Sequence, residues 1–264
     1  MYIQTRETNI HLSEQGKGEP TLVFLHYWGG SSRTWSGVVG TLSNQYRTIA
    51  LDHRGWGNSG APEHDYGMND LANDAQDAIK ALGLQRYVLV GHSMGGKVAQ
   101  LLASRRPQGL EGLILVAPSP PSPMVLPDEE RAMMAEAYNA RESIEWVVDN
   151  VLTASPLSLQ HREQVIEDSL RAAPQAKAAW PQQGMLEDIT SAVGAINVPV
   201  RVIAGEKDQV DRVETLRQEL MPRIAGARLS ILAGVGHLSP LEAPTALADE
   251  IRDCLETWMA SAEA

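Results

Sequence analysis

The fold is decided by the stretch YVLVGHSMGGKVAQLLASR, which spans residues 87–105. Residues 87–90 are apolar, rich in β-formers and few in number, which predicts a short buried strand. Residues 97–105 are good helix formers with apolar side chains at three- and four-residue spacing, which predicts a helix. Between the two lies the pentapeptide GHSMG, residues 91–95, a G-x-S-x-G pattern at a strand-to-helix turn.

A serine at such a turn is exposed in a strained conformation, because the chain reverses sharply between the strand and the helix. The turn needs small neighbours, and Gly91 and Gly95 provide them. The pentapeptide alone is weakly specific, since about one chain in ten of this length matches it by chance. A glycine-rich loop whose Ser93 caps the helix is the alternative, so the interpretation depends on partners elsewhere in the chain.

Size and composition indicate a soluble globular protein. The chain has 264 residues, of which 43% are hydrophobic and 21% are charged, enough for one large domain or a core with an insertion. The net charge is −11 and the isoelectric point is about 5.1, with no cluster of lysine or arginine. This balance argues against nucleic acid or an anionic membrane surface as a partner. The oligomeric state is not predicted.

The N-terminal residues 1–7 lack the basic start and apolar core of a signal peptide. No segment is apolar over the length needed to span a bilayer. Cys254 is the single cysteine, so no intrachain disulfide can form, and its apolar-periodic surroundings predict a small buried hydrophobe. These features lead us to expect a cytoplasmic protein.

Strand-like and helix-like segments alternate on both sides of the opening stretch. Residues 2–5 and 9–13 are expected to form a hairpin at a sheet edge. The further segments expected are strands at 21–26, 46–52, 110–117, 198–204 and 228–232, and helices at 33–42, 69–82, 213–220 and from about Thr245. Such alternation predicts an α/β fold, with a mostly parallel central sheet and helices on both faces.

The alternation stops at Pro118. Three prolines in residues 119–123 prevent a helix or a central strand there, so this segment is expected to be a linker. The chain from about residue 128 to residue 194 reads as helical, with breaks expected at Pro156, Pro174 and Pro181.

We therefore predict a helical cap, residues 119–194, inserted into a core domain made of residues 1–118 and 195–264. The apolar side chains of this insertion either line a substrate pocket or pack the insertion onto the core. The candidates for an adaptable lining are Met133, Met134, Trp146, Trp180 and Met185.

A serine hydroxyl is a weak nucleophile until a base takes its proton, and a third group must orient that base. Functional groups of a parallel α/β sheet gather at the carboxyl ends of its strands. Asp208 follows the strand expected at 198–204, and His237 follows the one expected at 228–232. Asp211 is a nearby competitor, but Asp208 is closer to the strand end. Ser93, Asp208 and His237 thus occur in the order nucleophile, acid, histidine.

Together these segments resemble the α/β-hydrolase superfamily over nearly the whole chain. The sequence DHRGWGNS, residues 52–59, is similar to the D-x-R-G-x-G-x-S loop of the superfamily. Gly236-His237 followed by Glu242-Ala243-Pro244 is similar to its histidine loop, and Asp208 fits its G-x-x-D pattern. The resemblance implies an α/β-hydrolase fold with a helical cap and a triad of Ser93, Asp208 and His237, with no cofactor and no metal.

The oxyanion of such a reaction needs fixed donors. We expect one to be the backbone N–H of Met94, at the start of a helix, and the other the N–H of Tyr27, after the strand at 21–26. Members of the superfamily commonly have His-Gly where this chain has His26-Tyr27, but any residue except proline supplies the N–H. The Tyr27 and Trp28 side chains either shape the pocket or pack within their loop, and we name Trp28, Trp146 and Trp180 as pocket candidates.

We expect His26, His53 and His92 to support loops by hydrogen bonding. We expect Asp52 and Arg54 to have a structural role.

These residues predict a metal-independent serine hydrolase that cleaves a small-to-medium, partly hydrophobic carboxylic ester or lactone through an acyl-enzyme. Serine as the nucleophile disfavours haloalkane dehalogenases and epoxide hydrolases of the superfamily, which use aspartate. A carbon–carbon bond hydrolase, a perhydrolase or an acyltransferase on the same core stays open, as does a non-catalytic ligand receptor of this fold.

Overall fold

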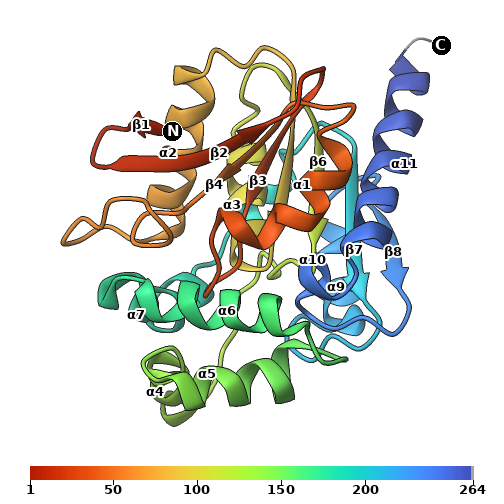
Figure 1. The fold of residues 1–264 in the computed structure, drawn as a ribbon. Coiled ribbons are helices and arrows are strands. Elements are labelled where there is room, and N and C mark those ends of the chain that lie inside the picture. The colour runs from red at the N-terminus through yellow and green to blue at the C-terminus, as the bar shows by residue number, and fades with distance from the viewer. Residues whose placement is uncertain (263–264) are drawn as a thin grey trace.

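The computed structural model describes residues 1–262, which fold around one eight-stranded sheet of order β1-β2-β4-β3-β5-β6-β7-β8 (Figure 1). The strands are β1 (Tyr2–Gln4), β2 (Asn9–Gln15), β3 (Thr21–Leu25), β4 (Thr48–Leu51), β5 (Tyr87–His92), β6 (Leu110–Val116), β7 (Val200–Gly205) and β8 (Arg228–Leu232). The β1–β2 hairpin at one edge is antiparallel, as is the β2–β4 pair, and the other neighbours are parallel. The predicted α/β fold is confirmed.

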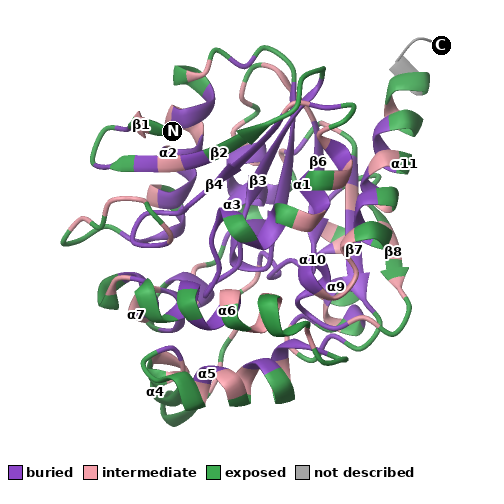
Figure 2. Cartoon of the chain, viewed as in Figure 1, coloured by how far each residue is buried: buried purple, intermediate pink, exposed green. Residues whose placement is uncertain are grey.

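Helices cover both faces of the sheet. Helices α1 (Ser36–Leu42) and α11 (Pro244–Ala262) pack on one face, and α2 (Met68–Ala81) and α3 (Met94–Ser104) pack on the other. Side chains of a strand alternate between faces, so Phe24 of β3 joins the α1–α11 core whereas Val23 joins the α2–α3 core. This two-sided burial explains the apolar runs of residues 22–25 in β3 and 87–90 in β5, and Figure 2 shows the central strands as buried.

Residues 119–194, which we call the inserted segment, connect β6 to β7 and are largely helical. The segment contains α4 (Asp128–Glu136), α5 (Arg141–Val147), a π-helical turn (Val148–Leu152), α6 (Leu159–Arg171), α7 (Pro174–Gln182), a 3-10 turn (Gly184–Leu186) and α8 (Thr190–Val193). Helices α4 to α7 lie together at one end of the sheet (Figure 1), and the outermost, α4, has no buried residue (Figure 2).

The remaining elements are short: a 3-10 turn (Ser32–Trp35), α9 (Val213–Glu219), a 3-10 turn (Met221–Arg223) and α10 (Ser239–Glu242). The described helices include none with the combination of length and apolar character that a membrane-spanning helix needs.

Proline positions mark the ends of helices in the inserted segment. Helix α6 begins after Pro156, and Pro174 begins α7, because proline suits the first turn of a helix. The break expected at Pro181 comes one residue later, because α7 ends at Gln182. A proline in the last turn removes one hydrogen bond and leaves the preceding turns intact.

Polar contacts fasten the inserted segment to the core. Asp168 of α6 is buried and accepts hydrogen bonds from the Ser31 hydroxyl at 2.8 Å and from Arg33 Nη2 at 2.8 Å. Trp28 Nε1 donates to the carbonyl of Lys177 at 3.0 Å, and Ser169 Oγ donates to the carbonyl of Gly29 at 2.9 Å. Hydrogen bonds with α6 and α7 therefore hold the loop after β3 in place.

Candidate active site

Ser93 occupies a strained turn between β5 and α3, with φ of 53° and ψ of −118°. A positive φ is uncommon for a residue other than glycine and persists only where the surroundings enforce it. The flanking glycines allow the turn, because a Cβ on Gly91 would lie 2.4 Å from the carbonyl oxygen of Gly95, and one on Gly95 would lie 2.5 Å from that of Leu25. The strained turn expected from the pentapeptide is present, but the expected exposure of the serine is wrong: Ser93 is buried, with 7% of its surface exposed.

Asp208 and His237 come together from neighbouring strands. Asp208 follows β7, His237 follows β8, and His237 Nδ1 lies 2.9 Å from Asp208 Oδ2, with both side chains buried. The other carboxylate oxygen, Oδ1, accepts the backbone N–H groups of Val210 at 2.8 Å and Asp211 at 3.0 Å. The carboxylate is thus fixed by its own loop and directed at the imidazole.

This pairing shifts both pKa values. Burial alone would raise the pKa of Asp208, but the His237 charge and the backbone donors outweigh it and hold that pKa below its usual value. Burial disfavours the His237 imidazolium, but the Asp208 carboxylate outweighs this effect and raises the pKa of His237. The site therefore favours a positive charge on the imidazole more than water does.

Two further side chains hold the loop of His237. His92 Nε2 lies 2.9 Å from the carbonyl oxygen of His237, and the two rings pack with centroids 5.1 Å apart. The Glu242 carboxylate accepts the N–H of Gly236 at 3.1 Å and that of Ala154 at 2.8 Å, which joins the histidine loop to the inserted segment. His92 supports a loop as the sequence predicts, whereas the contact between Glu242 and Ala154 has no sequence signal.

Ser93 and His237 line one cavity of about 580 Å³ between the sheet and the inserted segment. All three tryptophans expected there line the cavity: Trp28 and Trp180 are buried, and Trp146 is 61% exposed. The remaining lining residues are Tyr27, Met124, Leu126, Glu130, Met133, Met134, Ala137, Tyr138, Val147, Val151, Leu152, Met185, Gln209 and Val210. Most are apolar, as is typical of a pocket for a partly hydrophobic ligand.

Sequence reasoning missed several of these lining residues. Met124 and Leu126 lie between the linker and α4, where the sequence has no periodicity, and Leu152 lies in the π-helical turn. Gln209 and Val210 follow Asp208 directly, so their place beside the cavity follows from that of Asp208. Strand-end position would have found the last two, but no sequence pattern marks the others.

The two backbone N–H groups expected at the oxyanion, those of Tyr27 and Met94, lie just after the neighbouring strands β3 and β5. Leu25 pairs with Gly91 in the parallel β3–β5 register, so Tyr27 and Met94 follow the same edge of the sheet. Met94 is the first residue of α3, where the N–H has no acceptor within the helix. The Tyr27 ring packs on His92 with centroids 5.1 Å apart while lining the cavity, so it both packs its loop and shapes the pocket.

The loop of residues 52–59 is structural. Asp52 accepts the N–H of Ser32 at 2.6 Å and that of Asn58 at 2.8 Å, and Arg54 makes a two-pronged ion pair with Asp74. None of these residues lines the cavity that contains Ser93. Within residues 1–262, no group of three or more His, Cys, Asp or Glu side chains is arranged to hold a metal ion.

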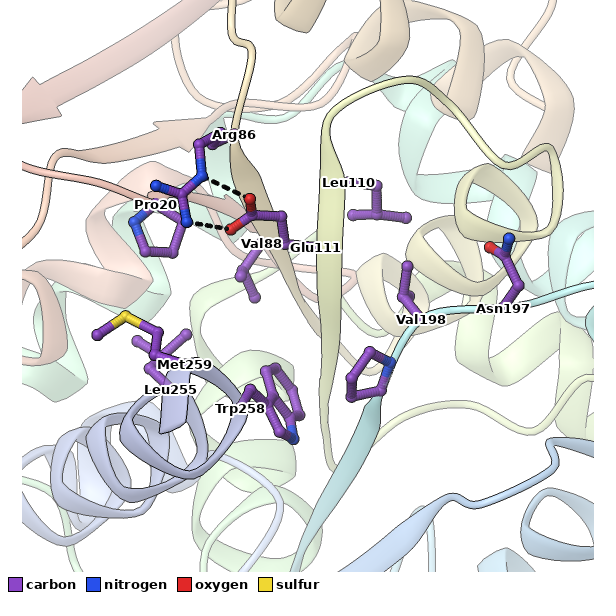
Figure 3. A pocket seen from close by; sticks show the side chains of 11 residues that line it. Pro20, Arg86, Val88, Leu110, Glu111, Asn197, Val198, Leu255, Trp258 and Met259 are labelled. Atoms are coloured by element: carbon purple, nitrogen blue, oxygen red, sulfur yellow. Dashed lines mark hydrogen bonds and ion pairs between the residues drawn. The ribbon is translucent and has the colours of Figure 1, made fainter. Parts of the chain in front are cut away.

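A second cavity, of about 330 Å³, lies at the amino ends of β3, β5, β6 and β7 (Figure 3). Trp258 and Met259 of α11 form one side, and the Arg86 guanidinium at its edge is paired with Glu111 at 2.6 Å. Groups that perform chemistry in such sheets gather at the opposite, carboxyl ends. The cavity at Ser93 is therefore the candidate active site.

The sequence profile of the family described as alpha/beta hydrolase fold matches residues 20–244. The chain belongs to this family. Over 261 residues it is 28% identical to a non-heme haloperoxidase of Rhodococcus erythropolis, covering 92% of this chain and 94% of the relative. It is 26% identical over 249 residues to the carboxylesterase YbfK of Bacillus subtilis, covering 92% and 83%. An esterase structure from Exiguobacterium antarcticum superimposes with a TM-score of 0.89 at 23% identity, covering 97% and 98%.

These similarities support a hydrolase on the α/β-hydrolase fold. The relatives carry different activity names on one fold, so the substrate must be argued from the site of this chain.

Proposed function

We propose that this protein is a serine hydrolase with Ser93 as nucleophile, His237 as general base and acid, and Asp208 as the acid that orients His237. The observation that carries the proposal is the 2.9 Å contact between His237 Nδ1 and Asp208 Oδ2, made at the wall of a cavity that Ser93 also lines. A carboxylate at Nδ1 selects the tautomer whose Nε2 can accept the proton of a serine hydroxyl.

In this mechanism Ser93 Oγ attacks the carbonyl carbon of the substrate while His237 Nε2 takes its proton. The N–H groups of Met94 and Tyr27 donate to the oxyanion, and the start of α3 adds a favourable dipole. The imidazolium then gives its proton to the leaving alcohol, which leaves an acyl group on Ser93. Water, deprotonated by His237, releases the acid and restores the hydroxyl.

The cavity supports an ester or lactone of small-to-medium size that is partly hydrophobic. Its lining is largely aliphatic, aromatic and methionine side chains, and methionine adapts to ligands of different shape. Apart from His237, Glu130 is the charged side chain beside the cavity. Its negative charge disfavours an anionic substrate. A core of 1–118 and 195–264 with a cap of 119–194 fits this arrangement, with the cap supplying most of the acyl-binding surface.

The test is a panel of p-nitrophenyl esters and lactones of graded chain length, applied to wild type and Ser93→Ala. Wild type is expected to turn over repeatedly, with a preference for medium chains. The variant is expected to unfold at the wild-type temperature but to lose about 10³-fold or more in kcat. Unchanged esterase activity of Ser93→Ala would contradict the proposal, and a burst limited to one turnover would favour a ligand receptor.

A second candidate is peracid formation, favoured by the full-length similarity to a non-heme haloperoxidase. Hydrogen peroxide would replace water in the attack on the acyl-enzyme, with the same three residues. Competition between peroxide and water in one assay distinguishes the two, because a perhydrolase forms peracid in preference to acid. The same assay with an added alcohol detects acyl transfer, and a β-diketone substrate detects carbon–carbon bond cleavage.

A further inference from the structure

Asp211 is a buried acid beside the Asp208–His237 pair. It lies three residues after Asp208, and its backbone N–H donates to Asp208 Oδ1 at 3.0 Å. Its side chain is fully buried, and neither carboxylate oxygen has a hydrogen-bond partner. Burial of a carboxyl group without partners destabilises the fold, and an apolar side chain of the same size would suit the position better. The presence of an acid there therefore calls for a functional explanation.

Three charged or titratable groups interact electrostatically with Asp211. Asp208 acts on it from its own loop, His237 from the loop after β8, and Lys97 from α3. Lys97 is itself fully buried, and its ammonium donates one hydrogen bond, to the carbonyl of Ser122 at 3.4 Å.

Further out, Glu187 and Asp188 act on Lys97, and Glu242 acts on His237. A second acid and a cation thus lie within electrostatic reach of the groups proposed for catalysis.

The protonation of Asp211 changes near neutral pH. Burial raises the pKa of Asp211 to about 7, with His237 and Lys97 opposing the rise and Asp208 adding to it. Burial lowers the pKa of Lys97 to about 8. Asp211 is thus neutral in mild acid and negatively charged in mild base, at a position where its charge acts on the imidazole.

We propose that Asp211 is a positioning residue for His237, a second acid whose negative charge stabilises the imidazolium that forms when Ser93 attacks the substrate. Charges interact strongly in a buried, weakly polarisable site, so a carboxylate there acts on His237 without touching the substrate. This role rests on the serine hydrolase proposed above. If Asp211 acts in this way, turnover depends on the ionisation of Asp211 as well as on that of His237.

The decisive comparison is Asp211→Asn, which keeps the shape of the side chain and removes its charge. The measurement is kcat/KM from pH 5 to pH 9 with one p-nitrophenyl ester. Wild type is expected to show two ionisations on the acid side and the variant one, displaced to lower pH because His237 has lost a negative neighbour. At pH 8 the variant is expected to be about tenfold slower, the equivalent of one pKa unit of lost stabilisation.

Thermal unfolding tests the same ionisation without activity. The folded state holds the proton of Asp211 more tightly than the unfolded state does, so this group stabilises least above neutral pH. Asp211→Asn is therefore expected to unfold at a higher temperature than wild type at pH 8, and this difference should become much smaller at pH 4, where the unfolded state also begins to hold the proton. An equal difference at both pH values would contradict the ionisation.

Lys97→Met provides an independent variant, because methionine fills a similar volume without the cation. Asp211 should then ionise at higher pH, and the second ionisation of kcat/KM should move in the alkaline direction. Curves of Asp211→Asn and Lys97→Met that superimpose on wild type would overturn the inference and leave the proposed hydrolase intact. If Asp211→Asn fails to fold, an unchanged Lys97→Met curve overturns it alone. Full activity of Ser93→Ala would instead overturn the proposed function.

Discussion

The conformation of Ser93 requires glycine at the flanking positions 91 and 95. The turn that places Ser93 at the cavity wall exists because Gly91 and Gly95 have no Cβ, and this lets β3, β5 and α3 approach closely. The elbow is therefore a packing arrangement of three elements around one strained residue. A methyl group added at Gly91 or Gly95 is therefore expected to lower both the stability of the protein and its activity.

Gly95→Ala tests this coupling. The added Cβ would lie 2.5 Å from the carbonyl oxygens of Leu25 and His26, backbone atoms that cannot move aside cheaply. We expect a loss of about 1–3 kcal/mol in the free energy of unfolding and a fall in kcat, measured by urea unfolding and ester hydrolysis. Gly40→Ala is the matched control, since its Cβ meets open space on α1, and it should stabilise by about 0.5–1 kcal/mol. Equal effects of the two changes would refute the packing explanation.

Individual site residues were predictable to different degrees. Ser93, Asp208 and His237 could be chosen because each follows a recognisable strand, and the structure brings Asp208 and His237 into contact. Their catalytic roles remain proposals. Asp208 was preferred to Asp211 because it is closer to the strand end, and the structure pairs Asp208 with His237. The burial of Asp211 and its missing partners are visible only in three dimensions.

Among the elements, the strands and helices of the core follow from periodicity, whereas the inserted segment does not. A strand buried on both faces and an amphipathic helix have distinct patterns, so β5 and α3 were predicted close to their observed bounds. The break expected at Pro181 comes one residue later, at the end of α7. The π-helical turn and α10 are too short to give a periodic signal.

The contact of α6 with the core can be tested by removing the Asp168 carboxylate. Asp168→Ala removes the acceptor of Ser31 and Arg33 at a buried position, and we expect a loss of about 1–3 kcal/mol in urea unfolding. Glu167→Ala removes the exposed partner of the same Arg33 and should cost less than about 1 kcal/mol. If the two losses are equal, Asp168 is not what fastens α6.

A bulkier cavity wall should change the choice of substrate. Met134→Trp narrows the cavity from the side of α4, so KM for a decanoate ester is expected to rise about tenfold while that for an acetate ester changes little. Leu159→Trp is the control, since Leu159 is 87% exposed and does not line the cavity. A similar rise of KM for both esters would show that the acyl chain lies elsewhere.

At the scale of the whole molecule, the sheet brings together loops that are distant in sequence. Ser93, Asp208 and His237 lie after β5, β7 and β8, and the parallel arrangement directs all three loops to the edge that the inserted segment covers. Fold class and strand-end chemistry were predictable because they follow from local patterns and connection rules. The shape of the cavity was not, since it depends on how α4 to α7 pack over the sheet.

The most direct test of the central claim is an intact-protein mass spectrum after reaction with a fluorophosphonate, followed by peptide mapping. If Ser93 is the nucleophile, one phosphonyl group per chain is expected on Ser93, and none on Ser93→Ala. A slow ester substrate present in excess should also protect Ser93 from the label. Labelling at another residue, or equal labelling of Ser93→Ala, would show that Ser93 is not the nucleophile.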